Sequence, residues 1–159
     1  MKITRKGYGQ VEPNHLSAKR NGQIYAQYPA VDGISELQNG MFVTFDGGKV
    51  KFATTGEQYL VYNEVKVYDT LRESTKDFAL KAEDCVSGVI VPRLFKTNVG
   101  DIMTTNMVDS EAECTVGATL AVGDNGTLTV GGAGAAKWTI VALTTMPDGQ
   151  PAVKVMRTA

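Results

Sequence analysis

Residues 86–108 read VSGVIVPRLFKTNVGDIMTTNMV, and this stretch decides the fold class. It contains the β-branched run 89–91, after which Pro92 removes one backbone donor. Residues 98–101 have the composition of a turn, and residues 102–105 return to apolar and β-branched side chains. Such side chains favour strands, and Gly, Asn and Pro favour the turns that separate them. The stretch therefore predicts a strand, a turn and a second strand.

Two tight hairpins repeat this pattern elsewhere in the chain. The first joins 41–45 to 49–53 through Asp46-Gly47-Gly48, and the second joins 117–122 to 127–130 through a tip with Asn125-Gly126. Asp, Asn and Gly tolerate the positive φ angles that short hairpin turns require. Both tips are therefore expected to reverse the chain between paired strands.

The remaining alternating segments predict strands at 59–62, 64–68, 111–116, 138–143 and 152–156. Residues 70–84 fit either a short helix or an edge strand, because a capping pattern at 74–77 precedes an alternation at 78–83. Seventeen glycines in 159 residues suit a chain with many tight turns. We expect a mostly β protein, either a small β-barrel or a β-sandwich of short antiparallel strands.

Residues 1–30 differ in composition from the rest of the chain. They carry five Lys and Arg residues against one Glu, and they hold few aliphatic side chains for a core of their own. Several Gly and Pro residues oppose a long helix there. We expect an extended N-terminal arm at 1–30 and a single β-rich domain at 31–159. The arm is either a disordered or loosely docked terminus, or a segment that orders against a partner.

The second interpretation of the arm identifies candidate contact residues. Tyrosine and arginine are the side chains that protein interfaces favour, and both are interleaved in this segment. We therefore expect contacts with a macromolecular partner from Arg5, Tyr8, Arg20, Tyr25 and Tyr28. A partner with an acidic surface would suit the charge, and a nucleic acid would use the same residues.

Composition narrows the classes of function. The formal net charge is −1 with 21% charged residues, so the whole chain does not have the charge of an electrostatic nucleic-acid binder. Residues 1–10 lack the apolar region of a signal peptide, and no run approaches the roughly 18 apolar residues of a membrane helix. We expect a protein that is made in the cytoplasm and does not associate with a membrane. Cys85 and Cys114 are expected to be free thiols.

Known catalytic and metal-binding patterns do not fit this sequence. His15 is the only histidine and lies in the arm, which is a poor place for a triad. One His and two separated Cys do not supply the four close ligands of a zinc site. The run GGAGAA at 131–136 lacks the Lys-Ser/Thr ending of a phosphate loop, and its glycines instead predict a flexible loop or a close backbone approach. We expect no enzyme activity, no cofactor and no bound metal.

Three segments carry a resemblance to a known family. They are GVIVPRLFKTNVGDIMTTN at 88–106, VGATLAVGDNGTLTVG at 116–131 and WTIVALTTMPDGQPAVKVM at 138–156. Over residues 37–159 the chain resembles the small β-barrel capsid decoration, or cement, proteins of tailed bacteriophages. The resemblance implies a non-enzymatic structural protein that binds and stabilises the assembled head, often as a homo-oligomer, with an N-terminal segment that grips the lattice. Its partner would be the major capsid protein lattice, and its location the capsid exterior of the virion after synthesis in the host cytoplasm.

Two other functions stay open at this point. The chain could be another virion component, such as a head-fibre base or a tail or connector subunit, with the same β-fold and no catalysis. It could also be a small β-barrel that binds nucleic acid through the basic arm, although the net charge disfavours this. Binding of that kind would weaken steeply with salt.

Overall fold

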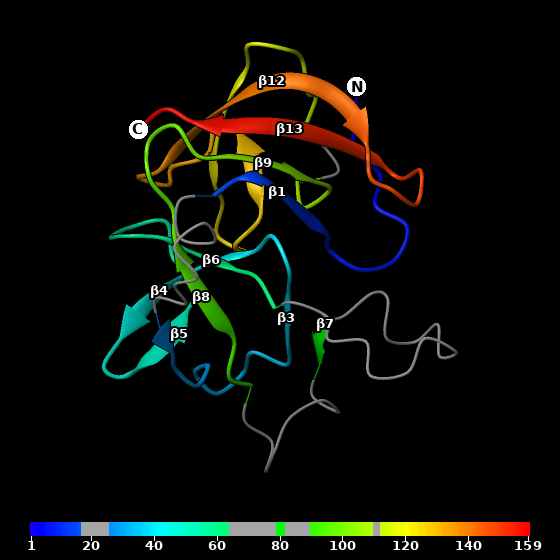
Figure 1. Cartoon of the computed structure of the whole chain (residues 1–159). Coiled ribbons are helices and arrows are strands. Elements are labelled where there is room, and N and C mark those ends of the chain that lie inside the picture. The colour runs from blue at the N-terminus through cyan, green and yellow to red at the C-terminus, as the bar shows by residue number, and fades with distance from the viewer. Residues whose placement is uncertain (17–25, 64–78, 82–89, 110–111) are drawn as a thin grey trace.

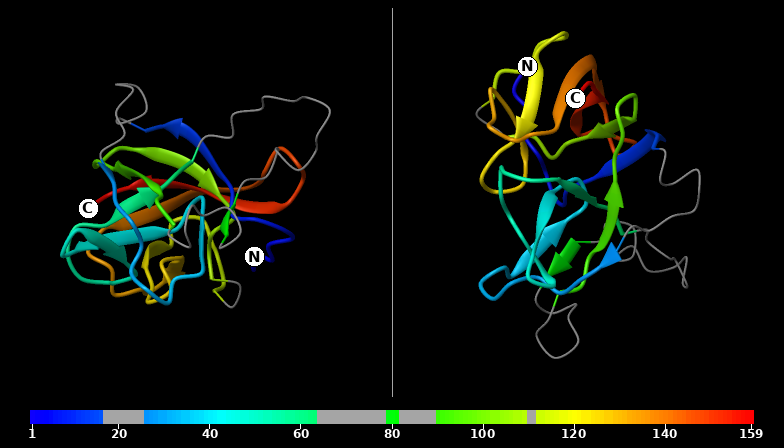
Figure 2. Two further views of the ribbon diagram at one scale, coloured as in Figure 1. Left: turned by 90° about the horizontal axis from the view of Figure 1, so that it is seen from below. Right: turned by 90° about the vertical axis from the view of Figure 1, so that its left-hand side faces the viewer.

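The computed structural model describes residues 1–16, 26–63, 79–81, 90–109 and 112–159. These residues form strands and no helix, arranged as two antiparallel sheets and a short strand pair (Figure 1 and Figure 2). The two sheets lie against each other as in a β-sandwich and do not close into one barrel. The prediction of a mostly β protein built from short antiparallel strands is confirmed.

The larger sheet has six strands, and it forms the upper layer of Figure 1. In spatial order they are β1 (Val11–His15), β9 (Ile102–Thr105), β13 (Pro151–Arg157), β12 (Lys137–Thr145), β10 (Thr119–Val122) and β11 (Leu128–Val130). The first and last strands of the chain thus lie on either side of β9.

The second sheet has five strands and forms the lower layer. Its order is β2 (Ala26–Gln27), β8 (Arg93–Lys96), β6 (Tyr59–Val61), β4 (Phe42–Asp46) and β5 (Lys49–Lys51). The chain after β2 reaches the opposite edge, where Val50 N donates to Pro29 O (2.9 Å) and Val31 N donates to Val50 O (2.9 Å). A separate pair joins β3 (Glu36–Gln38) to β7 (Ala79–Lys81).

The five-stranded sheet is apolar on both faces. Phe42, Leu60 and Phe95 belong to a first core that they share with Trp138 and other side chains of the six-stranded sheet. Their neighbours in the same strands belong to a second core, which Ala30, Leu37 and Ile90 complete: these neighbours are Val43, Tyr59, Val61 and Leu94. Because side chains alternate along a strand, β4, β6 and β8 each contribute to both cores.

Both hairpin turns occur as the sequence predicts. Asp46 pairs with Lys49, so Gly47 and Gly48 form a two-residue turn with φ angles of 55° and 85°. At the tip between β10 and β11, Gly126 has a φ angle of 78°. In each case glycine occupies backbone geometry that other residues adopt only with strain.

The central stretch folds differently from a simple strand, turn and strand hairpin. Its two strands, β8 and β9, exist as predicted, but they belong to different sheets and do not pair. The turn between them is closed by the hydrogen bond from Asp101 N to Asn98 O (3.0 Å) and carries the chain from one layer to the other. Ile90 and Val91 precede the strand in irregular backbone, because β8 begins only after Pro92.

Three further strand predictions have mixed outcomes. The strand expected at 111–116 is wrong for the residues described there, where only Glu113 forms a bridge, with Lys2. The strand expected at 64–68 lies outside the described residues. Of residues 70–84, the structure describes only 79–81, which form a strand at the edge of the β3–β7 pair and so favour the edge-strand alternative for those residues.

The first sixteen residues pack on the rest of the chain. Strand β1 pairs with β9, and Ile3 and Leu16 are buried in the first core. These two aliphatic side chains do not form a core of their own but complete the first core with the rest of the chain. A division of the chain into an arm at 1–30 and a domain at 31–159 stays a prediction.

Candidate functional site

Three buried side-chain amides hold residues 6–10 against the molecule. We call Gln38, Asn106 and Gln150 the amide clamp. Backbone N–H groups of the N-terminal segment donate to its three oxygens: Lys6 N to Gln150 Oε1 (2.7 Å), Gly9 N to Gln38 Oε1 (2.5 Å) and Gln10 N to Asn106 Oδ1 (2.7 Å). Asn106 Nδ2 also donates to Tyr8 O (3.2 Å), so this amide holds the segment through both of its polar atoms.

The clamp residues come from three separate places in the fold. Gln38 ends β3, Asn106 follows β9, and Gln150 precedes β13, and each side chain is less than a tenth exposed. A buried amide without hydrogen bonds is costly. The backbone N–H groups of residues 6–10 supply these hydrogen bonds, so the contact stabilises both the clamp residues and the segment. The clamp binds backbone groups and therefore recognises an extended course of the chain, not particular side chains.

Gly9 fits the clamp because it has no side chain. A Cβ atom at this position would lie 2.4 Å from Met107 Sδ and 2.6 Å from Asn39 O. The segment thus approaches the backbone of the fold more closely than any other residue type would allow. Sequence reasoning missed the clamp, although amide residues beside apolar ones, as in Leu37-Gln38 and Asn106-Met107, were a signal that could have found it.

Asp148 supports the clamp from the turn between β12 and β13. Its carboxylate accepts hydrogen bonds from Gln150 Nε2 (2.5 Å), Gln150 N (3.1 Å) and Gln10 Nε2 (2.9 Å). These bonds, chiefly the one from the Gln150 side chain, hold the pKa of Asp148 below its usual value. The ionised form is therefore favoured in the folded protein.

Replacing Asp148 with asparagine should lower stability at neutral pH and have less effect in acid. Because the folded-state pKa is lowered, the contribution of the carboxylate is present above the unfolded pKa of about 3.9 and is lost as the pH falls through the folded value. The side chain is exposed, so we expect a difference under about 1 kcal/mol at pH 7. Urea unfolding of both proteins at pH 7 and near pH 2 measures it, and an equal difference at both pH values would contradict the assignment.

The structure places three of the five predicted contact residues. Arg5 is half-buried in the clamp region, where its Nε donates to Gly7 O (3.1 Å) and its Nη1 lies 2.7 Å from Met107 Sδ. Tyr8 is half-buried beside it, whereas Tyr28 lies at the five-stranded sheet. Arg5 and Tyr8 therefore lie on the same N-terminal segment, and Tyr28 lies at the five-stranded sheet. Arg20 and Tyr25 lie outside the described residues.

Tyr28 is 42% exposed and is more exposed than Tyr8, the other tyrosine of this set that the structure describes. Its ring meets Phe45 edge-on at a centroid distance of 5.1 Å, and Phe45 packs in turn on Tyr59 at 4.4 Å. Aromatic pairs of this geometry stabilise one another beyond the area they bury. The exposed ring thus rests on Phe45, which Tyr59 supports in turn.

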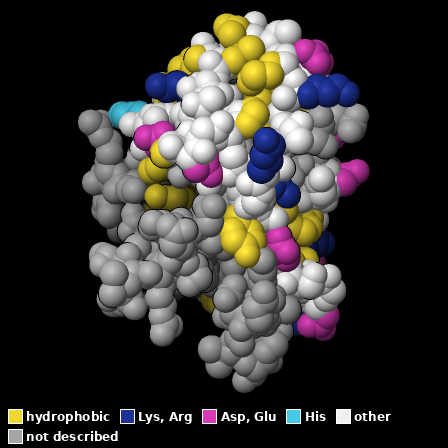
Figure 3. Space-filling view, turned by 90° about the vertical axis from the view of Figure 1, so that its right-hand side faces the viewer, with side chains coloured by type: hydrophobic (Ala, Val, Ile, Leu, Met, Phe, Trp, Pro, Cys, Tyr) yellow, Lys and Arg dark blue, Asp and Glu magenta, His cyan; other side chains and the backbone are white. Residues whose placement is uncertain are grey.

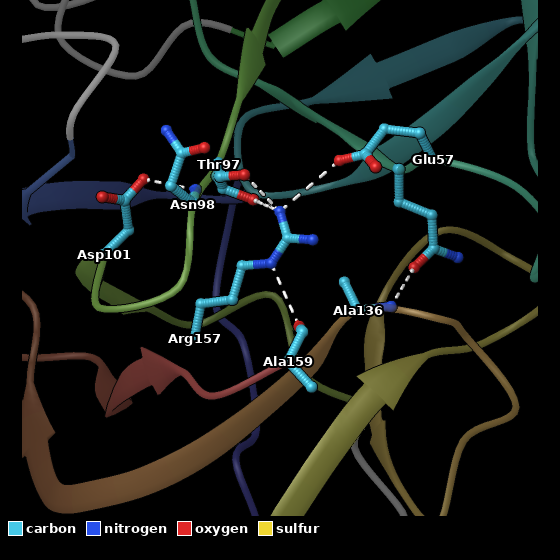
Figure 4. Close-up of polar contacts among 8 residues, drawn as sticks. Glu57, Thr97, Asn98, Asp101, Ala136, Arg157 and Ala159 are labelled. Atoms are coloured by element: carbon cyan, nitrogen blue, oxygen red, sulfur yellow. Dashed lines mark hydrogen bonds and ion pairs between the residues drawn. The ribbon is translucent and has the colours of Figure 1, made fainter.

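A second polar cluster joins the two sheets at the end of β13 (Figure 4). Arg157 Nη1 donates to Thr97 Oγ1 (2.8 Å) and to Thr97 O, and Arg157 Nε donates to Ala159 O (3.1 Å). Glu57 Oε1 lies 3.6 Å from Nη1 and is partly exposed, so its contribution is small. Since Thr97 follows β8 and Arg157 ends β13, the guanidinium connects one layer to the other.

Removing this guanidinium should destabilise the protein more than a surface substitution does. Arg157→Ala leaves buried Thr97 without its charged donor, and we expect a loss of about 1.5–3 kcal/mol. Arg157→Lys is the matched control, because it keeps the charge but cannot reach Thr97 and Ala159 at once, and it should lose part of this. Urea unfolding followed by circular dichroism measures both, and a change within about 0.5 kcal/mol for alanine would mark Arg157 as an ordinary surface residue.

The glycine-rich run at 131–136 serves close packing. A Cβ atom on Gly132 would lie 2.6 Å from Ala121 O, and one on Gly134 would lie 2.6 Å from Val122 N. The predicted close approach of two backbones is therefore confirmed. The loop also lines an open hollow of about 430 Å³ together with Asp109, Asp124 and the tip between β10 and β11.

The other residues considered for chemistry have structural places. His15 ends β1 opposite Ile102. Cys114 is a fully buried free thiol, and burial raises its pKa, while Cys85 lies outside the described residues. In the part of the chain that the structure describes, no three or more His, Cys, Asp or Glu side chains gather as a metal site would require. The same part contains no helix long and apolar enough to span a membrane.

Comparisons with protein-family models, with curated proteins and with solved structures find no match to this chain. The resemblance to capsid decoration proteins, and the partners and location that it implies, therefore stay predictions.

Proposed function

We propose that the chain is a non-enzymatic virion protein that binds the assembled capsid of a tailed bacteriophage and stabilises it. The observation that carries the proposal is the presentation of Tyr28: its exposed ring is fixed by Phe45 on a two-sheet body. A rigid aromatic side chain loses little conformational freedom on binding, which is why such residues anchor protein interfaces. The resemblance over residues 37–159 supplies the identity of the partner.

The N-terminal segment supports the same role at a second place. The amide clamp fixes the backbone of residues 6–10, which include Tyr8, and Arg5 Nη1 contacts Met107 Sδ (2.7 Å), so both side chains are also offered from a defined position. A protein that binds the assembled lattice but not its separated subunits stabilises the lattice by mass action. At a free concentration 100 times the dissociation constant, this amounts to about 2.7 kcal/mol per site.

Co-sedimentation with purified capsid-like particles tests the proposal. The full chain should pellet with the particles and saturate at a fixed ratio to capsid subunits. Tyr28→Ala should weaken binding at least about tenfold, as expected for an interface anchor. Val99→Ala is the matched control, because Val99 is 69% exposed in the turn between β8 and β9. A chain that stays in the supernatant with the particles would contradict the proposed function.

Nucleic-acid binding is the second candidate, favoured by the exposed Lys2 and Lys6 near Arg5. A filter-binding titration with double-stranded DNA at several salt concentrations separates it from the first. Affinity that falls steeply as salt rises, with no pelleting on capsids, would favour this alternative.

A further inference from the structure

Half of β12 extends beyond its neighbour in the six-stranded sheet. Strand β10 pairs only with residues 137–139, and the last contacts on that side are Gly117 N to Ile140 O (2.8 Å) and Ile140 N to Ala118 O (3.0 Å). Residues 141–145 continue with β13 on the other side. Among the described residues, no backbone hydrogen bond reaches their outer edge.

The hydrogen-bonding groups on this edge can be assigned from the alternation of the strand. Met146 N donates to Gln150 O (2.8 Å), so the backbone groups of Met146 face β13. Alternate residues of an antiparallel strand face opposite sides, which turns the N–H and C=O groups of Thr145 and Leu143 outward. The bulge between Ile140 and Ala142 shifts the alternation of the strand by one residue. The backbone groups of Ile140 therefore also face away from β13, as those of Leu143 and Thr145 do.

The composition of the edge lacks the usual protection against strand pairing. Residues 141–145 read VALTT, with no charge and no proline, and Val141 and Leu143 are 40% and 38% exposed. Three edge strands of the two sheets are protected: β1 carries Glu12 and Pro13, Val108 bridges to β11, and the chain at 29–31 covers β5. An open, uncharged edge of this kind pairs readily with another strand.

We propose that two copies of the chain pair through this edge, antiparallel and about a two-fold axis at Leu143. The axis would place Leu143 opposite Leu143 of the second copy and Thr145 opposite Val141. The stretch is uncharged along its whole length, so pairing with itself brings no like charges together. The six-stranded sheets of the two copies would then form one continuous sheet.

Exposed apolar side chains beside the edge extend this surface. Met1 is 39% and Val116 62% exposed, and the hydrogen bonds from Cys114 N to Met1 O (2.9 Å) and from Gly117 N to Ile140 O bring them toward the start of the open edge. Figure 3 shows hydrophobic side chains gathered at the top of the molecule. Pairing of five residues alone buries far less than the roughly 1,600 Å² of a standard interface, so this added apolar area matters for a stable dimer.

Sedimentation velocity of the full chain tests the proposal over about 1–100 µM, the range in which a micromolar dimer dissociates. We expect a monomer–dimer equilibrium. Leu143→Lys should weaken the dimer at least about tenfold, because it places two like charges opposite each other. Val99→Lys makes the same chemical change at an exposed site in the turn between β8 and β9 and should leave the equilibrium unchanged.

Two further variants test the pairing itself. Thr145→Pro removes an outward N–H group and should weaken the dimer while the pairing of β12 with β13 persists. A mixture of Leu143→Lys and Leu143→Asp chains should restore a heterodimer, because only a two-fold contact at Leu143 brings the two side chains together. Circular dichroism confirms that each variant is folded.

A monomer at every concentration, a closed trimer, or a dimer that neither Leu143→Lys nor Thr145→Pro weakens would overturn the proposal. An isologous contact closes at two copies, so a larger ring is incompatible with it. The inference does not depend on the proposed function, since the contact is between copies of this chain and is measured without capsids.

Discussion

Replacing Trp138 with alanine is expected to lower the free energy of unfolding by about 3–5 kcal/mol. The indole is fully buried in the first core, where its ring lies 5.7 Å from Phe42 of the opposite sheet. Truncation therefore opens a cavity at the point where the two layers meet, and close-packed neighbours fill such a cavity only in part. Urea unfolding followed by far-ultraviolet circular dichroism measures the loss.

Trp138→Phe is the matched control for this substitution. Trp138 Nε1 has no hydrogen-bond partner among the residues that the structure describes, so phenylalanine removes a buried donor that these residues leave unsatisfied while keeping most of the ring. We expect it to cost less than about 2 kcal/mol, well below the alanine variant. Equal losses for the two variants would show that the volume of the ring is not what joins the layers.

The second large effect is expected for Gly126→Ala, at about 3–5 kcal/mol, from backbone strain and overpacking together. Gly126 has a φ angle of 78°, and its carbonyl accepts the hydrogen bond from Phe42 N (2.8 Å) that joins the β10–β11 tip to β4. An added Cβ atom would lie 2.7 Å from Phe42 O and 2.6 Å from Phe52 Cδ1. The backbone oxygen cannot move aside without breaking the contact between the sheets.

Gly33→Ala separates the backbone strain from the overpacking, because it has only the first. Gly33 also has a positive φ angle, 94°, but apart from its chain neighbours no atom of the described residues lies within 4 Å of the position its Cβ would occupy. It should therefore lose only the strain of the left-handed backbone, about 1–2 kcal/mol. Thermal and urea unfolding of both variants give the comparison. If Gly126→Ala loses no more free energy of unfolding than Gly33→Ala, the β10–β11 tip accommodates the added methyl group without overpacking.

The local elements of this fold could be predicted from the sequence because their causes are local. Asp46-Gly47-Gly48 fixes the first hairpin through the φ angles of its glycines, and Asn125-Gly126 lies at the tip of the second. The strands on either side of each turn follow from alternation and β-branched side chains. Such signals need only a few neighbouring residues, so they survive in a single sequence.

Which strands pair depends on distant parts of the chain and was not predictable in the same way. The turn at 98–101 has the composition of a hairpin, but its two strands find partners in different sheets. That arrangement is favoured because it buries Phe95 and Met103 together in the one core between the two sheets. Strand β1 was missed for a related reason, because its partner β9 lies about ninety residues further along the chain.

The candidate site shows the same division. Tyrosine and arginine in the first thirty residues indicated contact residues, and the structure describes Arg5, Tyr8 and Tyr28 in positions consistent with partial exposure. The clamp that fixes the first two consists of Gln38, Asn106 and Gln150, three amides scattered along the sequence. No local pattern joins them, and only the fold brings them to one strip of backbone.

The position of β13 has a consequence for how the protein acquires its structure. It lies between β9 and β12 in the six-stranded sheet, yet it follows every other strand of that sheet in the sequence. During synthesis, β9 and β12 cannot be joined until β13 has left the ribosome. Until then β1 and β9 form a pair that is separate from the strands β10 to β12. The upper layer should therefore assemble late and all at once, and a chain that stops before residue 151 would expose one unpaired edge on β9 and one on β12 to chaperones and proteases.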